Sequence, residues 1–139
     1  MEPLLCLKDV KKSFGDVQAI EYVNLNIYKN SVIGLVGGNG AGKTTLLRLM
    51  SGVYRPTEGS VNLDNDRPVT EMRSVLGVVP ESTGLYSKLT AWENIRYHSR
   101  LHGIDDQLAW NRTYRFAKLL DIDGSLHRYT EGFSRGMKQ

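Results

Sequence analysis

The residues best suited to chemistry form a glycine-rich run that ends in a lysine and a threonine. The run is Gly37-Gly38-Asn39-Gly40-Ala41-Gly42-Lys43-Thr44. Glycines let backbone N–H groups converge on an anion without Cβ clashes. A lysine ammonium can reach terminal phosphates, and a threonine hydroxyl can bind Mg²⁺ beside phosphate oxygens. The spacing predicts a phosphate-binding loop, and the plain alternative is a glycine-rich turn that binds nothing.

The segments on either side of this run favour the phosphate-binding interpretation. Residues 32–36 are a short apolar run that predicts a buried strand, and residues 45–50 predict a helix. A helix N-terminus carries unpaired N–H donors and a partial positive charge, which favour a bound phosphate. A strand, a glycine turn and a helix in this order would position such a site.

Further strands are expected before and after this segment. Residues 4–10, 19–27 and 60–64 have the loose apolar alternation of strands, with a turn over residues 11–16. Residues 75–79 are rich in valine and predict a short buried strand. The first part of the chain therefore has an α/β layout with an antiparallel portion in front.

The C-terminal part of the chain is predicted to be helical. Thr90 and Glu93 form a capping box that starts a helix ending near His102. A second helix is expected from about residue 105 to about Leu120. Its predicted apolar face, at helical spacing, comprises Ala109, Thr113, Phe116, Ala117 and Leu120.

The composition excludes several classes of protein. Of the 139 residues, 40% are hydrophobic and 24% are charged, with a net charge of +3, which suits one domain of ordinary soluble composition. No apolar run approaches the roughly 20 residues of a membrane helix. The basic residues are scattered, which argues against nucleic-acid binding. The single cysteine, Cys6, permits no internal disulfide and fits an apolar core position in a cytosolic chain.

Four further segments accompany the loop in a fixed order. They are Lys12-Ser13-Phe14-Gly15, then Val78-Val79-Pro80-Glu81 followed by Leu89-Thr90-Ala91-Trp92-Glu93-Asn94, and finally Phe133-Ser134-Arg135-Gly136-Met137-Lys138-Gln139. Together with the loop, they make the whole chain resemble the first part of an ATP-binding cassette domain, the motor of ABC transporters. Within that family, the chain looks most like the ATPase subunits of bacterial exporters of the sodium- and drug-export type.

The resemblance implies a fold class and a division of the chain. The fold is α/β, a P-loop NTPase with an ABC-type core, an antiparallel β subdomain and a helical insert. Residues 1–81 would hold the antiparallel strands and the P-loop core, residues 82–133 the helical subdomain, and residues 134–139 the start of the signature helix. The Walker B strand, the acidic residue and the histidine that follow in the family are not found, so the domain is expected to be C-terminally truncated and inactive in isolation.

The resemblance also assigns nucleotide-binding roles. Phe14 matches the aromatic residue that stacks on adenine, and residues 37–44, followed by Thr45, match the Walker A loop. Glu81 stands where the family usually has glutamine, in the loop that touches Mg²⁺ and the attacking water, and a carboxylate there still suits Mg²⁺. Without the family, Phe14 is a strand-end aromatic packed on the core and Glu81 a polar residue that closes a strand.

The last segment resembles the family's signature, usually Leu-Ser-Gly-Gly-Gln. Ser134 and Gly136 are retained, whereas Phe133, Arg135 and Met137 depart from the pattern. In the family this segment begins a helix and touches the γ-phosphate of ATP held by the opposite subunit, with the serine donating a hydrogen bond. Taken alone, the segment is a helix cap in a glycine-containing turn.

The resemblance implies catalytic roles for Lys43, Glu81 and Ser134, with Thr44 and Glu81 as metal ligands. The cofactors would be ATP and Mg²⁺, and hydrolysis would be coupled to export. The partners would be a membrane-spanning permease subunit, on the cytoplasmic face of the membrane, and a second cassette in a head-to-tail dimer, with no nucleic acid.

Three other interpretations compete with this one. A truncated cassette would bind nucleotide without catalysis. A soluble ABC protein of translation or DNA repair would usually carry two cassettes or a coiled-coil insert, and neither is seen. A GTPase would need an Asn-Lys-x-Asp motif, which is absent, and a kinase has no use for the signature segment.

Overall fold

The computed structural model describes residues 3–64, 67–71, 76–79 and 84–138. The chain divides into two compact units, Met1–Val78 and Val79–Gln139. They are called the N-terminal unit and the C-terminal unit below. Each has its own arrangement of elements and its own packing.

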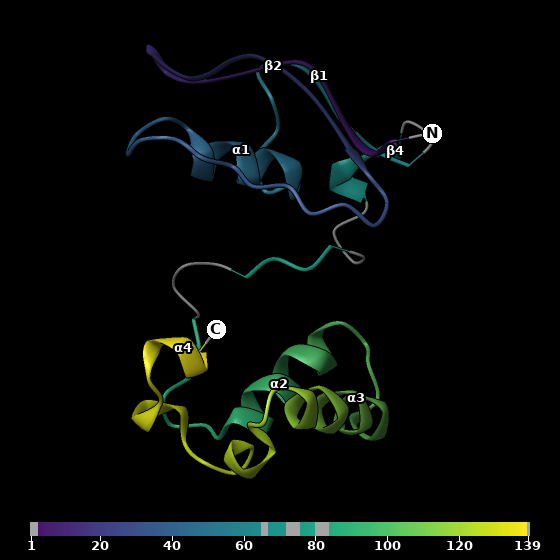
Figure 1. Ribbon diagram of the computed structural model, residues 1–139, viewed down its shortest axis with the longest axis vertical. Coiled ribbons are helices and arrows are strands. Elements are labelled where there is room, and N and C mark those ends of the chain that lie inside the picture. Colours follow the sequence, from purple (N-terminus) through teal and green to yellow (C-terminus); the bar gives the residue numbers. More distant parts are fainter. Residues whose placement is uncertain (1–2, 65–66, 72–75, 80–83, 139) are drawn as a thin grey trace. The chain divides into compact units, whose positions relative to one another are not determined.

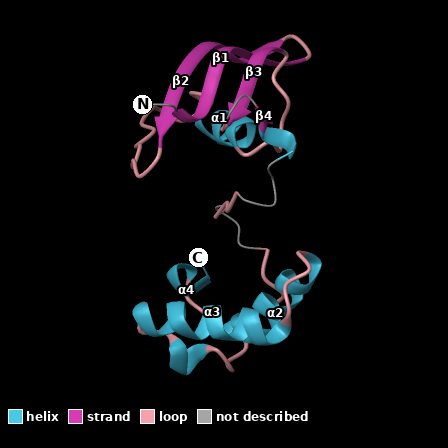
Figure 2. Ribbon diagram, turned by 90° about the vertical axis from the view of Figure 1, so that its right-hand side faces the viewer, coloured by secondary structure: helices cyan, strands magenta, loops and turns pink. Residues whose placement is uncertain are grey.

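The N-terminal unit is built on an antiparallel sheet (Figure 2). Its strands, in the spatial order β2-β1-β3-β4, are β1 (Pro3–Phe14), β2 (Val17–Tyr28), β3 (Glu58–Leu63) and β4 (Arg67–Pro68). The strands expected over residues 4–10, 19–27 and 60–64 are thus confirmed. The expected turn over residues 11–16 is wrong in extent, because β1 stays paired with β2 as far as Phe14 and the chain reverses only at residues 15–16.

Helix α1 (Lys43–Met50) covers one face of this sheet (Figures 1 and 2). Its buried residues Leu46 and Leu49 join the sheet residues in one hydrophobic core. The sheet contributes alternate positions along each strand, as expected when one face of a sheet is buried. These sheet residues are Leu5, Leu7, Val10, Ile20, Val61 and Leu63, and the short 3-10 helix Val69–Glu71 adds Val69.

Strand β1 bends at Asp9, where its register is interrupted against both neighbouring strands. Asp9 has a φ of 48°. Its backbone N–H donates to Asn24 Oδ1 at 2.8 Å, and Asn24 Nδ2 donates to Asp9 Oδ1 at 2.9 Å. The first bond satisfies a backbone N–H that the interrupted ladder leaves unpaired, and the second joins the two side chains. On the other side, Gly59 of β3 lies directly against the bulge.

Two predicted strands are absent from the described residues. Residues 32–36 form no regular secondary structure and belong to no sheet, and Val32 and Val36 are almost fully exposed. Residues 76–79 are also outside any strand, with Val78 and Val79 exposed. A strand needs a partner for its N–H and C=O groups. The described strands form an antiparallel sheet of their own, so none lies alongside these two segments.

The C-terminal unit is helical. It contains α2 (Ala91–Leu101), α3 (Asp106–Leu119) and α4 (Arg135–Lys138), with 3-10 turns at Asp123–Ser125 and Thr130–Gly132. Helices α2 and α3 pack side by side, and Trp92 and Trp110 meet edge to face at 4.9 Å between ring centroids. The helices predicted from the sequence are therefore confirmed.

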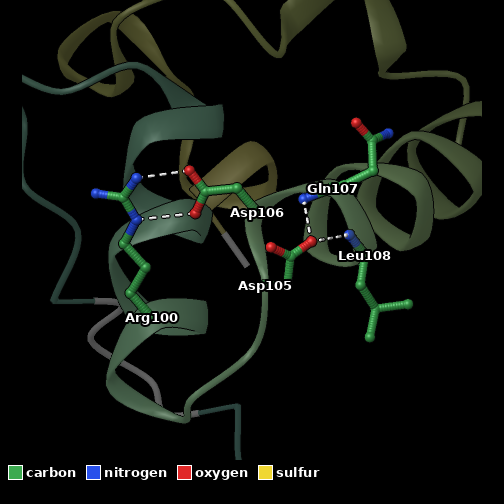
Figure 3. Close-up of polar contacts among 5 residues, drawn as sticks. All are labelled: Arg100, Asp105, Asp106, Gln107 and Leu108. Carbon is green, nitrogen blue, oxygen red and sulfur yellow. Dashed lines mark hydrogen bonds and ion pairs between the residues drawn. The ribbon is translucent and has the colours of Figure 1, made fainter.

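Side-chain caps fix where both long helices begin. Thr90 and Glu93 form the predicted capping box, each accepting a hydrogen bond from the other's backbone N–H. Asp105 caps α3 by accepting from the N–H groups of Gln107 and Leu108 (Figure 3). Beside this cap, Arg100 of α2 forms a bidentate pair with Asp106, at 2.8 and 2.6 Å. The connection between the helices is therefore fixed by charge as well as by backbone geometry.

The predicted apolar face of α3 is only partly correct. Ala109 and Ala117 are buried and Thr113 is half-buried, which defines a narrow stripe of small residues at four-residue intervals. Phe116 and Leu120, expected on the same face, are 60% and 68% exposed. Small side chains let two helices approach closely. Residues such as Phe116 and Leu120, which flank such a stripe on the helix surface, then remain outside the contact.

Replacing Gly59 by alanine is expected to destabilise the N-terminal unit by at least about 2 kcal/mol. Gly59 has a φ of +78°, and an added Cβ would lie 2.3 Å from the Lys8 carbonyl oxygen and 2.4 Å from that of Asp9. Urea denaturation followed by circular dichroism measures the loss. Gly15→Ala is the matched control, since Gly15 has a φ of +56° with no atom near its Cβ position. It should cost only about 1 kcal/mol, and equal losses would show that the close approach is not the constraint.

The C-terminal unit is expected to lose stability in acid. The Arg100 guanidinium, by its hydrogen bonds, holds the pKa of Asp106 below its ordinary value of 3.8. The backbone N–H and hydroxyl of Thr90 likewise hold the pKa of Glu93 below 4.5. A carboxyl whose pKa is lower in the folded state stabilises fully above its unfolded pKa, and this contribution disappears as the pH falls through the folded value.

The fluorescence of Trp92 and Trp110 reports on this unit, because both tryptophans of the chain lie within it. Urea midpoints measured between about pH 6 and about pH 3 should fall in the wild type and fall less in the Glu93→Gln/Asp106→Asn variant. The same pH dependence in both proteins would contradict the assignment.

Candidate nucleotide-binding site

The glycine-rich loop leads directly into the N-terminus of α1. Gly40 and Gly42 have φ values of 80° and 84°, in the left-handed region that favours glycine. Gly42 occupies the N-cap position without any side-chain cap, and the Leu46 N–H donates to its carbonyl at 2.8 Å. The first N–H groups of the helix therefore remain available to an anion in the loop.

Gly42 also sets the loop against the sheet. A Cβ at this position would lie 2.6 Å from the Ala19 carbonyl oxygen and 2.9 Å from Ile20 Cδ1 of β2. Glycine is thus required both for the backbone conformation and for the close contact. The β1–β2 hairpin and the phosphate loop are held together at this point.

Lys43 folds back over the loop that precedes it. Its ammonium donates to the Gly37 carbonyl at 2.7 Å and to the Gly38 carbonyl at 2.6 Å. Thr44 is exposed and Thr45 is half-buried in the same first turn. The arrangement holds a positive charge and a hydroxyl beside a turn of backbone N–H groups, which is the chemistry that polyphosphate and Mg²⁺ require.

Phe14 lies at the end of β1 in the same unit. Its ring is 44% exposed and contacts Tyr54 at 5.3 Å between centroids, with 70° between the ring planes. Lys12 Nζ lies 5.0 Å from the Phe14 centroid. The structure therefore brings Phe14 and the predicted phosphate loop into one packed unit, with part of the ring accessible to a ligand.

The remaining predicted site residues lie elsewhere in the chain. Ser134 and Gly136 belong to the C-terminal unit and are exposed, and Ser134 Oγ caps α4 by accepting from the Met137 N–H at 3.3 Å. This hydroxyl is at a helix N-terminus, as the signature resemblance implies. Glu81 lies outside the described residues.

Sequence reasoning missed the polar centre of the C-terminal unit. Asn94 is 1% exposed, and its Oδ1 accepts from the Tyr86 N–H at 2.8 Å. Its Nδ2 donates to the carbonyls of Tyr86, Leu89 and Thr90. Thr130, also 1% exposed, donates its hydroxyl to the Tyr86 carbonyl at 2.9 Å. This network fixes the segment before α2 to the segment that leads into the signature residues.

Only part of this network had a signal in the sequence. Asn94 follows the capping box directly, where an exposed helical position would serve equally well. Thr130 is 36 residues away, and no local pattern connects the two. Their burial arises from the fold of the whole unit.

The C-terminal unit also contains an apolar groove of about 870 Å³. Its lining includes Phe133, Gly136 and Met137 of the signature segment and His98 and His102 of the α2 region. In the part of the chain that the structure describes, no group of three or more histidine, cysteine or acidic side chains is placed to hold a metal ion. None of the described helices is long and apolar enough to span a bilayer.

Comparison with known families decides the identity of the fold. A family model described as ABC transporter matches residues 20–139. The chain belongs to the ABC transporter family. The family predicted from the sequence is therefore confirmed.

Relatives match nearly the whole chain. It is 35% identical over 144 residues to the ABC transporter ATP-binding protein NatA of Bacillus subtilis, which covers 98% of the chain and 58% of NatA. It is 33% identical over 137 residues to the Fe(3+) ions import ATP-binding protein FbpC of Vibrio cholerae, which covers 96% of the chain and 38% of FbpC. The chain thus spans about half or less of the length of these relatives.

Solved structures of the family have the same fold. CbiO1 from Clostridium perfringens, part of the ABC transporter complex cbiONQ, superposes with a TM-score of 0.84 at 22% identity, covering 99% of the chain and 58% of cbiO1. The ATP-binding cassette MJ0796, bound to ADP and Pi, superposes with a TM-score of 0.81 at 25% identity, covering 96% of the chain and 65% of the cassette. Because cbiO1 is only 22% identical, its likeness establishes the shared fold, an α/β P-loop core of the ABC type, and no more.

Replacing Asn94 by alanine is expected to lower the free energy of unfolding of the C-terminal unit by about 2–3 kcal/mol, because buried backbone groups lose their partners. Asn111→Ala is the matched control on α3, since Asn111 is exposed and accepts one bond, from Gln107, at 3.1 Å. That variant should stay within about 0.5 kcal/mol of the wild type. Urea unfolding followed by tryptophan fluorescence separates the two, and equal losses would contradict a structural role for the Asn94 network.

Proposed function

We propose that this chain binds MgATP. The residues of the loop, from Gly37 to Thr45, hold the phosphates, Thr44 and Glu81 bind Mg²⁺, and Phe14 stacks on the adenine. The observation that carries this proposal is the Lys43 ammonium folded over a glycine loop at an uncapped helix N-terminus. Its two carbonyl contacts hold the ammonium where phosphate oxygens would accept from it instead.

In the complete protein, we propose an ATP-binding subunit of an ABC transporter that couples ATP hydrolysis to export. Ser134 and Gly136, at the start of α4, would contact the γ-phosphate bound by a second cassette in a head-to-tail dimer. A membrane-spanning permease subunit would hold the dimer at the cytoplasmic face of the membrane. Export is supported by the resemblance of the chain to the ATPase subunits of bacterial exporters, although relatives such as FbpC are named for import.

Hydrolysis would use this chain's groups mainly for positioning and charge neutralisation. Lys43 would neutralise the terminal phosphates, Glu81 would bind Mg²⁺ and orient the attacking water, and Ser134 would donate to the γ-phosphate of the opposite site. None of the 139 residues is assigned to polarise the water as a general base. We therefore propose that the 139-residue chain alone binds ATP and hydrolyses it negligibly.

Replacing Lys43 by alanine is expected to weaken MgATP binding about 10- to 100-fold, the effect of losing a charge-assisted hydrogen bond to phosphate. Isothermal titration calorimetry of the 139-residue chain measures this. Lys29→Ala is the control, since Lys29 is an exposed lysine in the turn after β2, and it should bind as the wild type does.

The same samples test hydrolysis. Phosphate release should stay at the buffer background for both variants and for the wild type. Sustained, Mg²⁺-dependent release that Lys43→Ala abolishes would contradict the proposed inactivity of the chain alone, and unchanged ATP binding in Lys43→Ala would contradict the assigned site.

A further inference from the structure

The exposed ring of Phe14 is held in place by one neighbour in particular. Phe14 is the last residue of β1, immediately before the hairpin turn, and its side chain is 44% exposed. Tyr54, 40 residues further along the chain, packs against its ring at 5.3 Å and 70°. Edge-to-face contact of this kind favours one orientation of the ring pair.

Tyr54 is itself anchored to helix α1. Its hydroxyl accepts from Arg48 Nη1 at 2.9 Å, the Arg48 guanidinium lies 5.4 Å from its ring centroid, and its backbone N–H donates to the Arg48 carbonyl at 3.0 Å. Arg48 stands in the last turn of the helix whose first residue is Lys43. The phosphate loop and the Phe14 ring are therefore connected through a single short helix and two side chains.

The segment that contains Tyr54 is also hydrogen-bonded to β1. Lys12 Nζ donates to the Arg55 carbonyl at 2.9 Å, and the Thr57 N–H donates to the Lys11 carbonyl at 2.8 Å. The Lys12 ammonium lies within 5.8 Å of the Tyr54 centroid, in addition to its contact with Phe14. Cation–π attraction at these distances favours keeping the two rings together.

We infer that Tyr54 is a positioning residue for the base of the nucleotide. It fixes Phe14 relative to the phosphate loop, so that a purine stacks on a ring already ordered in the free protein. This inference rests on the proposed function, because it needs ATP to occupy the loop with its base on Phe14. Ordering the ring before binding removes part of the entropy cost that a mobile ring would add to association.

The test compares MgATP with magnesium tripolyphosphate, which lacks base and ribose, by calorimetry on the 139-residue chain. Tyr54→Ala is expected to weaken ATP binding about three- to tenfold, while tripolyphosphate affinity changes less than about twofold. Phe14→Ala should weaken ATP binding at least about fivefold, the effect of losing a stacked base. In the Phe14→Ala background, adding Tyr54→Ala should change nothing further.

Two further variants distinguish a loss of ring positioning from a loss of folding. Tyr54→Leu keeps apolar bulk at the position but removes the aromatic edge, so it should reproduce the loss of ATP affinity even if Tyr54→Ala folds poorly. Tyr28→Ala removes a comparable half-exposed tyrosine at the opposite end of β2, and it should leave both affinities unchanged.

The outcomes separate the inference from the proposed function. If Phe14→Ala weakens ATP binding but the Tyr54 variants do not, the positioning role of Tyr54 is overturned and the site stands. If the Tyr54 variants lose ATP and tripolyphosphate affinity equally, Tyr54 acts on the fold or the loop rather than on the base, and the inference is also overturned. If the wild type binds ATP no more tightly than tripolyphosphate, the stacking role of Phe14 fails and the inference fails with it.

Discussion

The burial of Leu46 and Leu49 beneath the sheet is the interaction on which the candidate site depends. Helix α1 has only 8 residues, which is too short to be stable in water by itself. Its helical form therefore depends on these two side chains packing against the core residues of β1, β2 and β3. Each buried leucine contributes about 1.5–3 kcal/mol. Without that contact, the N-terminal N–H groups would have no fixed direction and the loop no helix to lead into.

Because the core fixes the position of α1, both of its ends can place groups that contact a nucleotide. Its first turn carries Lys43 and the uncapped N–H groups, and its last turn carries Arg48, which bonds Tyr54 and through it contacts Phe14. The close contact of Gly42 with Ala19 fixes the loop end against β2. One packed helix thus fixes two places that a nucleotide would occupy, and this arrangement is the physical basis for the proposed binding of ATP.

The C-terminal unit is stabilised by a different principle. It has no sheet among its described residues, and its two most deeply buried described side chains, Asn94 and Thr130, are polar, beside a few buried apolar residues such as Leu126. The Asn94 amide bonds to backbone groups of Tyr86, Leu89 and Thr90, and the Thr130 hydroxyl donates to the Tyr86 and Leu89 carbonyls. Removing such a partner leaves buried groups unpaired, which costs more than the bond itself contributes. The hydrogen bonds of Thr130 therefore help to fix the position of the segment that leads to Ser134.

Local features of this protein were determined by the sequence itself. The spacing of glycines before Lys43 predicted the loop, the Thr90–Glu93 pair predicted the start of α2, and the order of the motifs predicted the family. These features depend on backbone preferences and side chains within a few residues of one another, so short stretches suffice to encode them.

Only the tertiary structure decided which segments pair as strands and which side chains make long-range contacts. Residues 32–36 have the composition of a buried strand but pair with no described strand, since pairing requires a neighbour that local sequence cannot supply. Phe116 has the spacing of a core residue but lies beside the stripe of small residues, and its side chain is 60% exposed. The contacts of Tyr54 with Phe14 and of Thr130 with the loop before α2 join residues about 40 apart, and such contacts form only when the whole unit has closed.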